Sequence, residues 1–408
     1  MTELTPQRER MLLWLLAFTQ FAVIMDFMVM MPLAPQLMRA FAVSPAAVSG
    51  AVSAYAWCAG LSGLFAATYI DRFSRRRLLL AAFALFGLSN LGCALAPTFP
   101  LLVLARAFAG LTAGVMSSLV LAIVSDVIPP QRRGAAMGTV MTSFGMAAVA
   151  GVPTGIMLAA HYNWSAPFYV LVLASALVWS CALSVMPTLD AHLARAPRTL
   201  AQVLPDLFGI FRVARHRYAF VLTCVTMMAS MMVIPFIAPV MVANLGVAPV
   251  DMTWIYLCGG AATLFTARIV GRWTDRLGAA RMYALMLCLS MVPVLWLTHL
   301  AEVPMVVIIL CFVFFMTSVS GRGIPMQALM TMVPDPAGRG AFLSVNSAVL
   351  QLGTGLGAWM GGLILTTDAG GHILNYGING FASAALAIFC AFWVRMLQPA
   401  QRPAVTAP

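Results

Sequence analysis

The chain has 408 residues, of which 62% are hydrophobic and only 9% are charged, and its mean hydropathy is +0.95. Soluble domains carry about a quarter of their residues as charged side chains, so this composition excludes a water-soluble protein. The net charge of +11 comes from arginines in short clusters between apolar runs. They lack the aromatic-interleaved basic face that binds nucleic acid, so we expect the lipid bilayer, and no nucleic acid, as their partner.

The sequence predicts twelve membrane-spanning helices. A helix needs about 20 apolar residues to cross a hydrocarbon core of about 30 Å, and backbone polar groups in lipid must be satisfied within the segment. The first apolar run is too long for a signal peptide, and we expect it to be retained as a span. Cut at the charged and Pro/Gly clusters, the spans fall near 12–37, 46–70, 78–96, 99–126, 134–160, 165–187, 219–245, 250–274, 281–301, 303–330, 339–365 and 375–397.

The arginines predict the orientation. With both termini in the cytoplasm, 19 arginines lie on cytoplasmic segments and only Arg39 lies on an outer loop, while Arg106, Arg268 and Arg322 lie within spans. The positive-inside rule favours this arrangement over its inverse. We therefore expect a multi-pass protein of a bacterial-type inner (cytoplasmic) membrane, with both termini cytoplasmic.

A charged stretch at 188–218 divides the spans six to six. It predicts a cytoplasmic linker between an N-terminal bundle at 1–187 and a C-terminal bundle at 219–408. Within the stretch, four apolar side chains recur at the spacing of a helix that lies on the membrane surface: Leu204, Leu207, Phe208 and Phe211.

The two halves resemble each other. The loop after span 2 begins with Asp71 and Arg72, and the loop after span 8 begins with Asp275 and Arg276, 204 positions later. A second match, at an offset of 206, relates Arg133-Gly134-Ala135 to Arg339-Gly340-Ala341 and places Gly151 and Gly155 on Gly357 and Gly361. Internal duplication is typical of transporters with parallel repeats. It predicts an all-α membrane protein with two pseudo-symmetric six-helix bundles.

Asp26 is the most informative residue of the spans. It lies about 14 residues into span 1, roughly 21 Å deep at 1.5 Å per residue, where an unpaired carboxylate costs several kcal/mol. Arg106 lies about 10 Å below the outer surface by the same rise, a depth compatible with contact. An ionisable residue inside a membrane indicates function by default, so we interpret Asp26 and Arg106 as the proton-coupling pair. A permanent structural ion pair is the alternative.

Further side chains are candidates for charge pairing at the span ends, for the substrate cavity and for bending of span 5. Asp126 is expected to pair with Arg72 or Arg75, although ordinary topogenic charge is the alternative. Arg322 stands between Gly321 and Gly323 and before Pro325, a pattern of an interrupted helix, where substrate sites form; a role at the membrane interface is the alternative. The remaining candidates for the substrate cavity are adaptable methionines, for which ordinary packing is the alternative: Met30, Met227 and Met231. Those for bending span 5 are Gly151, Pro153 and Gly155.

Cofactor chemistry has no support in the sequence. The eight cysteines have no CxxC spacing, and the five histidines are not paired at ligand spacing, so we expect neither a metal site nor a disulfide frame. Nothing matches a phosphate-binding G-x-x-x-x-G-K-S/T loop, and no nucleophile–base constellation stands at one depth. We expect no cofactor and no enzymatic activity.

Across its whole length the chain resembles the major facilitator superfamily, specifically its twelve-span drug:proton antiporter-like branch. Asp71, Arg72, Arg75 and Arg76 match the signature G-x-L-a-D-r-x-G-r-k, with Ala67 and Ser74 in place of its glycines. The second-half copy keeps Gly271, Asp275, Arg276 and Gly278. Leu102, Arg106 and Gly110 match l-x-x-x-R-x-x-q-G, with Ala109 in place of glutamine. Gly151-Val152-Pro153-Thr154-Gly155 is similar to the antiporter core G-P-x-x-G-G, with the proline displaced and one glycine missing.

This resemblance implies a secondary transporter that works by alternating access. It implies proton-coupled efflux of small amphipathic or lipophilic compounds, so that the partners are a small-molecule substrate and protons; the oligomeric state stays open. It also implies a conformational latch at the cytoplasmic mouth, formed by Asp71, Arg72, Arg75, Asp126, Asp275 and Arg276. The alternatives are a proton-coupled transporter of a specific metabolite, such as a sugar or amino-acid derivative, and a transporter-like receptor that does not cycle.

Overall fold

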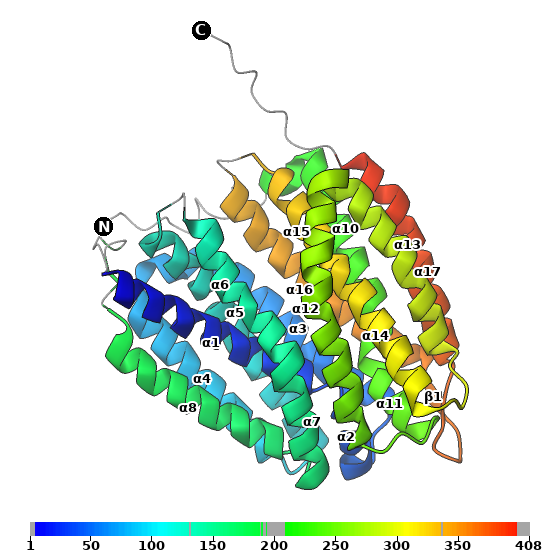
Figure 1. The fold of residues 1–408 in the computed structure, drawn as a ribbon. Coiled ribbons are helices and arrows are strands. Elements are labelled where there is room, and N and C mark those ends of the chain that lie inside the picture. The colour runs from blue at the N-terminus through cyan, green and yellow to red at the C-terminus, as the bar shows by residue number, and fades with distance from the viewer. Residues whose placement is uncertain are drawn as a thin grey trace.

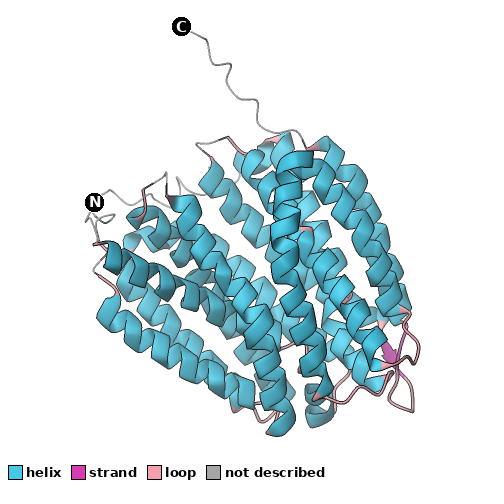
Figure 2. Cartoon of the chain, viewed as in Figure 1, coloured by secondary structure: helices cyan, strands magenta, loops and turns pink. Residues whose placement is uncertain are grey.

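The computed structural model describes residues 5–129, 132–187, 189–190, 193, 209–335 and 338–397, of which 67 and 68 are described in their backbone alone. The described chain is almost entirely helical, with one hairpin of two strands of two residues each (Figure 2). Most of the predicted linker, including Leu204, Leu207 and Phe208, lies outside the described residues, so the predicted surface helix stays a prediction.

The described part of the first half comprises ten helical elements, whose arrangement Figure 1 shows. They are α1 (Pro6–Val29), α2 (Ala34–Phe41), α3 (Pro45–Tyr69), η1 (Ile70–Arg72), α4 (Arg75–Ala94), α5 (Phe99–Val127), α6 (Arg133–Met146), η2 (Ala147–Gly151), α7 (Val152–His161) and α8 (Ala166–Val185). Helix α3 packs against α5, α4 lies between α5 and α8, and α1 contacts α5, α6 and α8. These contacts make one bundle.

The second half is built in the same way (Figure 1). Its elements are α10 (Ala214–Met231), η4 (Ile234–Phe236), α11 (Ile237–Ala243), α12 (Asp251–Leu277), α13 (Ala279–Thr298), α14 (Met305–Gly321), α15 (Gly323–Met332), α16 (Arg339–Ile364), β1 (Thr366–Thr367), β2 (Ile373–Leu374), α17 (Tyr376–Trp393) and η5 (Val394–Met396). Helix α10 packs against α16 and α17, and α14 packs against α12 and α13. The all-α fold of two six-span bundles is confirmed.

Eleven helical stretches of the described chain are long and apolar enough to cross a membrane. The twelfth predicted span is α16, which has 26 residues and so reaches about 39 Å. Its hydropathy is lower because glycines and polar side chains such as Asn346 and Thr354 face protein, not lipid. It packs against α3 of the first half and α10 of the second.

Three predicted spans are interrupted by proline, which has no backbone N–H for the helix ladder. Span 1 ends at Val29 and resumes as α2 after Pro32, so the single helix predicted over 12–37 is wrong. Span 7 breaks after Met231, before Pro235, and span 10 breaks at Arg322, before Pro325. The interruption predicted at Arg322 is therefore confirmed.

The two halves contact each other mainly towards one end of the molecule. We call the face that carries the described ends Thr5 and Leu397 the terminal face, and the other the opposite face. Towards the opposite face, α2 contacts α11, and η2 and α7 contact α12, while α16 lies along α3. Figure 1 shows the two bundles converging at this end, where α2, α7 and α11 are labelled.

Specific contacts mark how far this closure extends. Ser53 Oγ donates to the Gly355 carbonyl at 2.8 Å, the hydrogen bond that joins α3 to α16. A Cβ on Gly260 would lie 2.6 Å from the Ala148 carbonyl oxygen, so α12 and η2 touch through their backbones. Nearer the terminal face the ion pairs stay within one half, as in Glu9–Arg132 and Arg215–Asp335. The structure is thus closed on the opposite face.

Candidate functional site

The predicted partners Asp26 and Arg106 are in contact. Arg106 Nη1 donates to Asp26 Oδ1 at 2.5 Å, and both side chains are fully buried. Asp26 comes from α1 and Arg106 from α5, two spans of the first bundle. The depth estimated from helical rise therefore brought the right helices together.

A third side chain completes this site. The guanidinium of Arg106 stacks over the ring of Tyr55 from α3, with its Cζ 4.3 Å from the ring centroid. The Tyr55 hydroxyl donates to the Val23 carbonyl at 3.4 Å. Stacking of this kind stabilises a cation where water is excluded. Sequence reasoning missed Tyr55, because nothing in its own span marks it.

Gly110 explains why the ring and the guanidinium meet. It stands one turn after Arg106 on α5, and a Cβ there would collide with the Tyr55 backbone carbonyl. Because glycine has no side chain, α3 approaches α5 closely at this turn. The glycine of the motif was the signal that could have pointed to Tyr55.

The ion pair is only partly satisfied. Asp26 Oδ2, Arg106 Nε and Arg106 Nη2 are buried without a hydrogen-bond partner among the described residues. A buried pair whose lone pairs and protons lack partners stabilises a fold poorly, because desolvation offsets the Coulomb attraction. The pair therefore stabilises the fold less than a fully hydrogen-bonded ion pair would.

The glycines of span 5 lie against the helix that carries Asp26. Ala147–Gly151 forms a π-helical stretch just before Pro153; π-helical turns are frequent at functional sites. A Cβ on Gly151 would lie 3.3 Å from the Met25 side chain, and one on Gly155 would lie 2.5 Å from Val29 Cγ2. These glycines let span 5 pack tightly on α1 beside the buried carboxylate.

A second charged cluster occupies the terminal face of the first bundle. Arg75 Nη2 donates to Asp71 at 2.6 Å, its Nε to Asp126 at 2.9 Å, and its Nη1 to the Ile70 carbonyl at 2.7 Å. Asp126 thus pairs with Arg75, one of its two predicted partners, whereas Arg72 is exposed. These partners of Arg75 all belong to the first half, and within the described chain the predicted latch residues form no ion pair between the halves in this conformation.

The equivalent loop of the second half is built differently. Asp275 and Arg276 are exposed and form no ion pair within the described chain. An offset of 204 places Ala279 where the first half has Arg75, so this copy has no arginine at that position. Gly278 has φ +84°, a conformation that requires glycine, whereas Ser74 has φ −54°. That difference explains how the first copy tolerates serine at this position.

Arg322 lies inside the second bundle. It is only 4% exposed, and it donates to Ser230 Oγ of α10 and, at 3.5 Å, to Ser290 Oγ of α13. Within the described chain it has no carboxylate partner. Of the predicted cavity methionines, Met30 is fully buried in the first bundle, and Met227 and Met231 are half-buried on α10.

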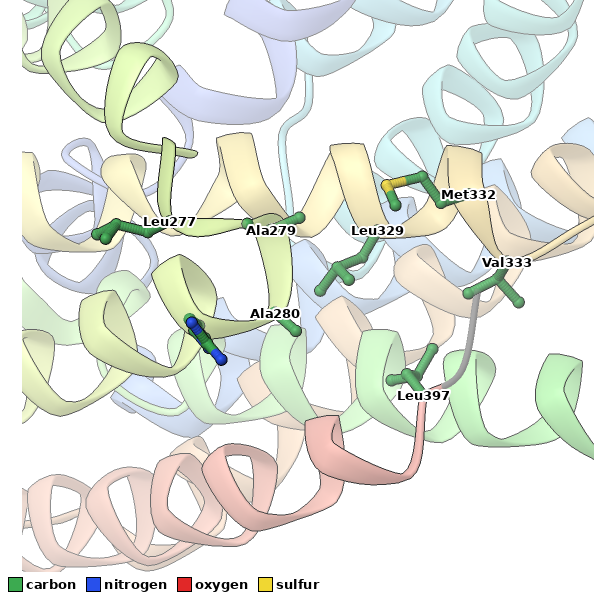
Figure 3. Close-up of a pocket in the computed structure, with 9 residues that line it drawn as sticks. Leu277, Ala279, Ala280, Leu329, Met332, Val333 and Leu397 are labelled. Carbon is green, nitrogen blue, oxygen red and sulfur yellow. The ribbon is translucent and has the colours of Figure 1, made fainter. Parts of the chain in front are cut away.

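A separate hollow of about 250 Å³ opens at the terminal face of the second bundle. Figure 3 shows its apolar walls, with Leu277 and Ala279 on one side and Leu329, Met332, Val333 and Leu397 on the other. Arg281 is its charged lining residue. It contains none of the residues of the Asp26–Arg106 site, so we assign it no part in that site.

Comparison with known proteins decides the family. The sequence model described as "Major Facilitator Superfamily" matches the chain twice, at residues 16–220 and 219–407. The chain belongs to the Major Facilitator Superfamily. Its double match agrees with the repeat inferred from the two loops.

Similar members of the Major Facilitator Superfamily include both transporters of unstated cargo and sugar carriers. The chain is 26% identical to "Uncharacterized MFS-type transporter YfhI" of Bacillus subtilis, over 77% of each chain. It is 25% identical to "Probable sugar efflux transporter" of Helicobacter pylori, over 88% of each. The crystal structure of a D-xylose–proton symporter shares the fold, with a TM-score of 0.78 and 16% identity, over 95% of this chain and 98% of that one. The chain is therefore a multi-pass membrane transporter of this superfamily.

Proposed function

We propose that this chain is a proton-coupled exporter of small amphipathic compounds, with Asp26 as the proton-binding group. The observation that supports this proposal is the fully buried Asp26–Arg106 pair with its three unpartnered polar atoms. A carboxylate held by an arginine, with the Tyr55 side chain beside it, is poised to lose the arginine when it takes up a proton. Protonation removes the charge that holds Arg106 and so biases the packing of α1 against α5.

The cycle then follows from the arrangement of the two halves. In the conformation described here the contacts gather at the opposite face, where α3 meets α16 and α12 meets η2. Alternating access requires a second conformation, closed at the terminal face. We propose that proton binding at Asp26 favours one of these two conformations and that cargo binding between the bundles favours the other. A ligand shifts such an equilibrium only if it binds the two conformations with different affinities.

The direction of transport rests on the arginine distribution. The described segments that are predicted to be cytoplasmic and rich in arginine belong to the terminal face, so we propose that this face is cytoplasmic in a bacterial inner membrane. The conformation then opens inward. An exporter loads its cargo from that side and takes up protons from the other.

A transport assay on reconstituted protein tests the proposal. Vesicles that carry a pH gradient and an internal pH dye would receive ethidium, arabinose or gluconate, which represent three cargo classes. At least one should dissipate the gradient through wild-type protein and not through Asp26→Asn. Asp251→Asn removes an exposed carboxylate at the start of α12 and should behave like wild type. Equal dissipation by Asp26→Asn and wild type would exclude Asp26 as the coupling residue.

A second candidate cargo is a sugar or sugar derivative. The name of the Helicobacter pylori relative, "Probable sugar efflux transporter", favours it, since the similarity extends over 88% of both chains. The same assay separates the two, because arabinose and gluconate are hydrophilic and ethidium is amphipathic. A chain that dissipates the gradient with none of the probes would instead fit a receptor that does not cycle.

A further inference from the structure

Arg322 is a buried cation for which the described chain supplies no counter-charge. It is 96% buried in a membrane span, where burial of an uncompensated charge is costly. Its partners are two neutral hydroxyls, Ser230 Oγ and Ser290 Oγ. Asp26 is the acidic side chain deep within the described spans, and it is engaged by Arg106 in the other bundle.

The internal repeat shows what the second bundle lacks. Ser230 stands 204 positions after Asp26, the offset that relates the two signature loops. Packing relates the same two helices at an offset of 203. Gly151 and Gly155 lie against Met25 and Val29 in the first bundle, and their counterparts Gly357 and Gly361 lie against Met228 and Met232 in the second. Ser230 is thus one position beyond the packing counterpart of Asp26. The first bundle places a carboxylate against an arginine in this turn, whereas the second places a serine against an arginine.

The two arginines are not themselves equivalent. At an offset of 206, the counterpart of Arg106 is Phe312. Arg322 instead reaches Ser230 from the break between α14 and α15. The second bundle thus has its own cation, directed at the helical turn where the first has its carboxylate.

Open space adjoins Arg322. Gly323 is exposed, and a Cβ built on it would meet nothing within 4 Å. One turn further along α15, Gln327 is also exposed. Lipid would leave its amide without hydrogen-bond partners, so this face of α15 borders water. A water-soluble molecule can approach the break in the helix along this face.

We propose that Arg322, with Ser230 and Ser290, binds the carboxylate group of the transported compound, so that the cargo is a small organic monocarboxylate. This inference rests on the proposed transport function and names its substrate class. The planar guanidinium matches the two oxygens of a carboxylate. The Ser230 and Ser290 hydroxyls donate to the Thr226 and Leu287 carbonyls and accept from Arg322, so they orient the guanidinium. A single buried positive charge neutralises one negative charge, which favours a monoanion over a dianionic phosphate.

Binding to the purified full-length protein in detergent tests this inference. The probes are acids and their neutral amides of nearly the same shape: benzoate with benzamide, gluconate with gluconamide, and lactate with lactamide. At least one acid should raise the melting temperature of the wild type more than its amide does. If no acid exceeds its amide, the inference is overturned.

Variants assign that effect to the site. Arg322→Gln should weaken binding of the acid by about tenfold to a hundredfold, the range for a lost hydrogen bond to a charged group. Arg268→Gln is the matched control, because it removes an exposed arginine from the neighbouring helix α12 and should change affinity less than about twofold. Preserved binding of the acid by folded Arg322→Gln would overturn the inference.

A further variant guards against misfolding of Arg322→Gln. Ser230→Asp places a carboxylate beside Arg322 and recreates in the second bundle the pair of the first. It should keep or raise the melting temperature of the protein and abolish the preference for acid over amide. If acids still stabilise Ser230→Asp as they do wild type, the inference fails.

The two proposals fail in distinguishable ways. If wild-type protein shows gradient-linked transport and no preference for acids, the transport function stands and the carboxylate cargo is excluded. If acids bind through Arg322 but no probe dissipates the pH gradient, the binding site stands and the proton-coupled exporter is excluded.

Discussion

At the scale of single residues, the Asp26–Arg106 ion pair has one hydrogen bond between its side chains, and three of its buried polar atoms have no partner among the described residues. Removing one partner of a buried pair leaves an uncompensated charge and costs about 3–5 kcal/mol. We expect Arg106→Ala to lower the free energy of unfolding by about that amount. The double variant with Asp26→Asn should be no less stable than Arg106→Ala alone, because neither orphan charge remains.

Chemical or thermal unfolding of the four proteins in that cycle measures the coupling. An interaction energy above about 1 kcal/mol is expected. A cycle of Arg106→Ala with Arg77→Ala, an exposed arginine, should be additive and serves as the control. Additivity in both cycles would contradict a direct energetic link between Asp26 and Arg106.

Arg75 illustrates the opposite case, a buried arginine with every nitrogen engaged. Its side chain donates to Asp71, Asp126 and the Ile70 carbonyl, and so fixes the loop between α3 and α4. Arg75→Gln should lower the free energy of unfolding by about 2–3 kcal/mol, since hydrogen bonds to charged groups are the stronger kind. Arg77→Gln, two residues on and exposed, should change it by less than about 0.5 kcal/mol. Equal melting temperatures for the two variants would show that the Arg75 cluster does not stabilise the fold.

At the scale of elements, close approach of helices sets the geometry of the site. Gly110 brings α3 against α5, and a Cβ there would collide with the Tyr55 carbonyl. Gly110→Ala should therefore separate the Tyr55 ring from Arg106 and destabilise the protein by about 1–3 kcal/mol. Gly138→Ala on α6 is the control, because a Cβ there meets nothing within 4 Å; it should be neutral or stabilising by up to about 1 kcal/mol. The comparison needs only melting temperatures, and a neutral Gly110→Ala would contradict the packing argument.

The sequence was most informative about elements that lipid constrains and least about breaks within them. All twelve spans were predicted from apolar stretches cut at charged and Pro/Gly clusters, and the match of Arg339-Gly340-Ala341 with Arg133-Gly134-Ala135 independently supports α16, whose hydropathy is lower. The break at Arg322 was readable from the flanking glycines. The break after Val29 was not, because Pro32 and Pro35 stand within an otherwise continuous apolar run.

In the candidate site, too, the charged residues were predictable from the sequence and the uncharged ones were not. Asp26 and Arg106 were paired by depth, because an intramembrane charge has few possible partners. Tyr55 and Ser230 could not be found in this way, since uncharged side chains occur at every depth. Their roles follow from which helices pack together, as Gly110 decides for Tyr55.

At the scale of the whole molecule, the contact between α3 and α16 is the most extensive one between the two bundles in the present conformation. This contact seam runs along α3 and α16, from the turn of Ser49 and Gly362 near the opposite face to Gly60 and Gln351 near the middle of the membrane. Motifs in the sequence do not state which side is closed, because a transporter must populate both states. Only tertiary packing reveals it, through contacts such as Ser53 to Gly355.

Cross-linking this seam tests whether its opening is part of the transport cycle. A Cβ on Gly362 would lie 3.2 Å from Ser49 Cβ, close to the separation of about 3.5–4.5 Å found in disulfides. Ser49→Cys with Gly362→Cys, on a background freed of the eight native cysteines, should therefore form a disulfide on oxidation. Because the bond holds the opposite face closed, gradient-linked transport should cease, and a reductant should restore it. The controls are Ser49→Cys alone with the same oxidant and the double variant kept reduced, both of which should transport; Gly362→Cys alone is no control, since its Cβ would lie 2.1 Å from Ser49 Oγ. Transport that continues with the cross-link formed would mean that the two bundles do not separate along α3 and α16, and cargo would have to leave by another route.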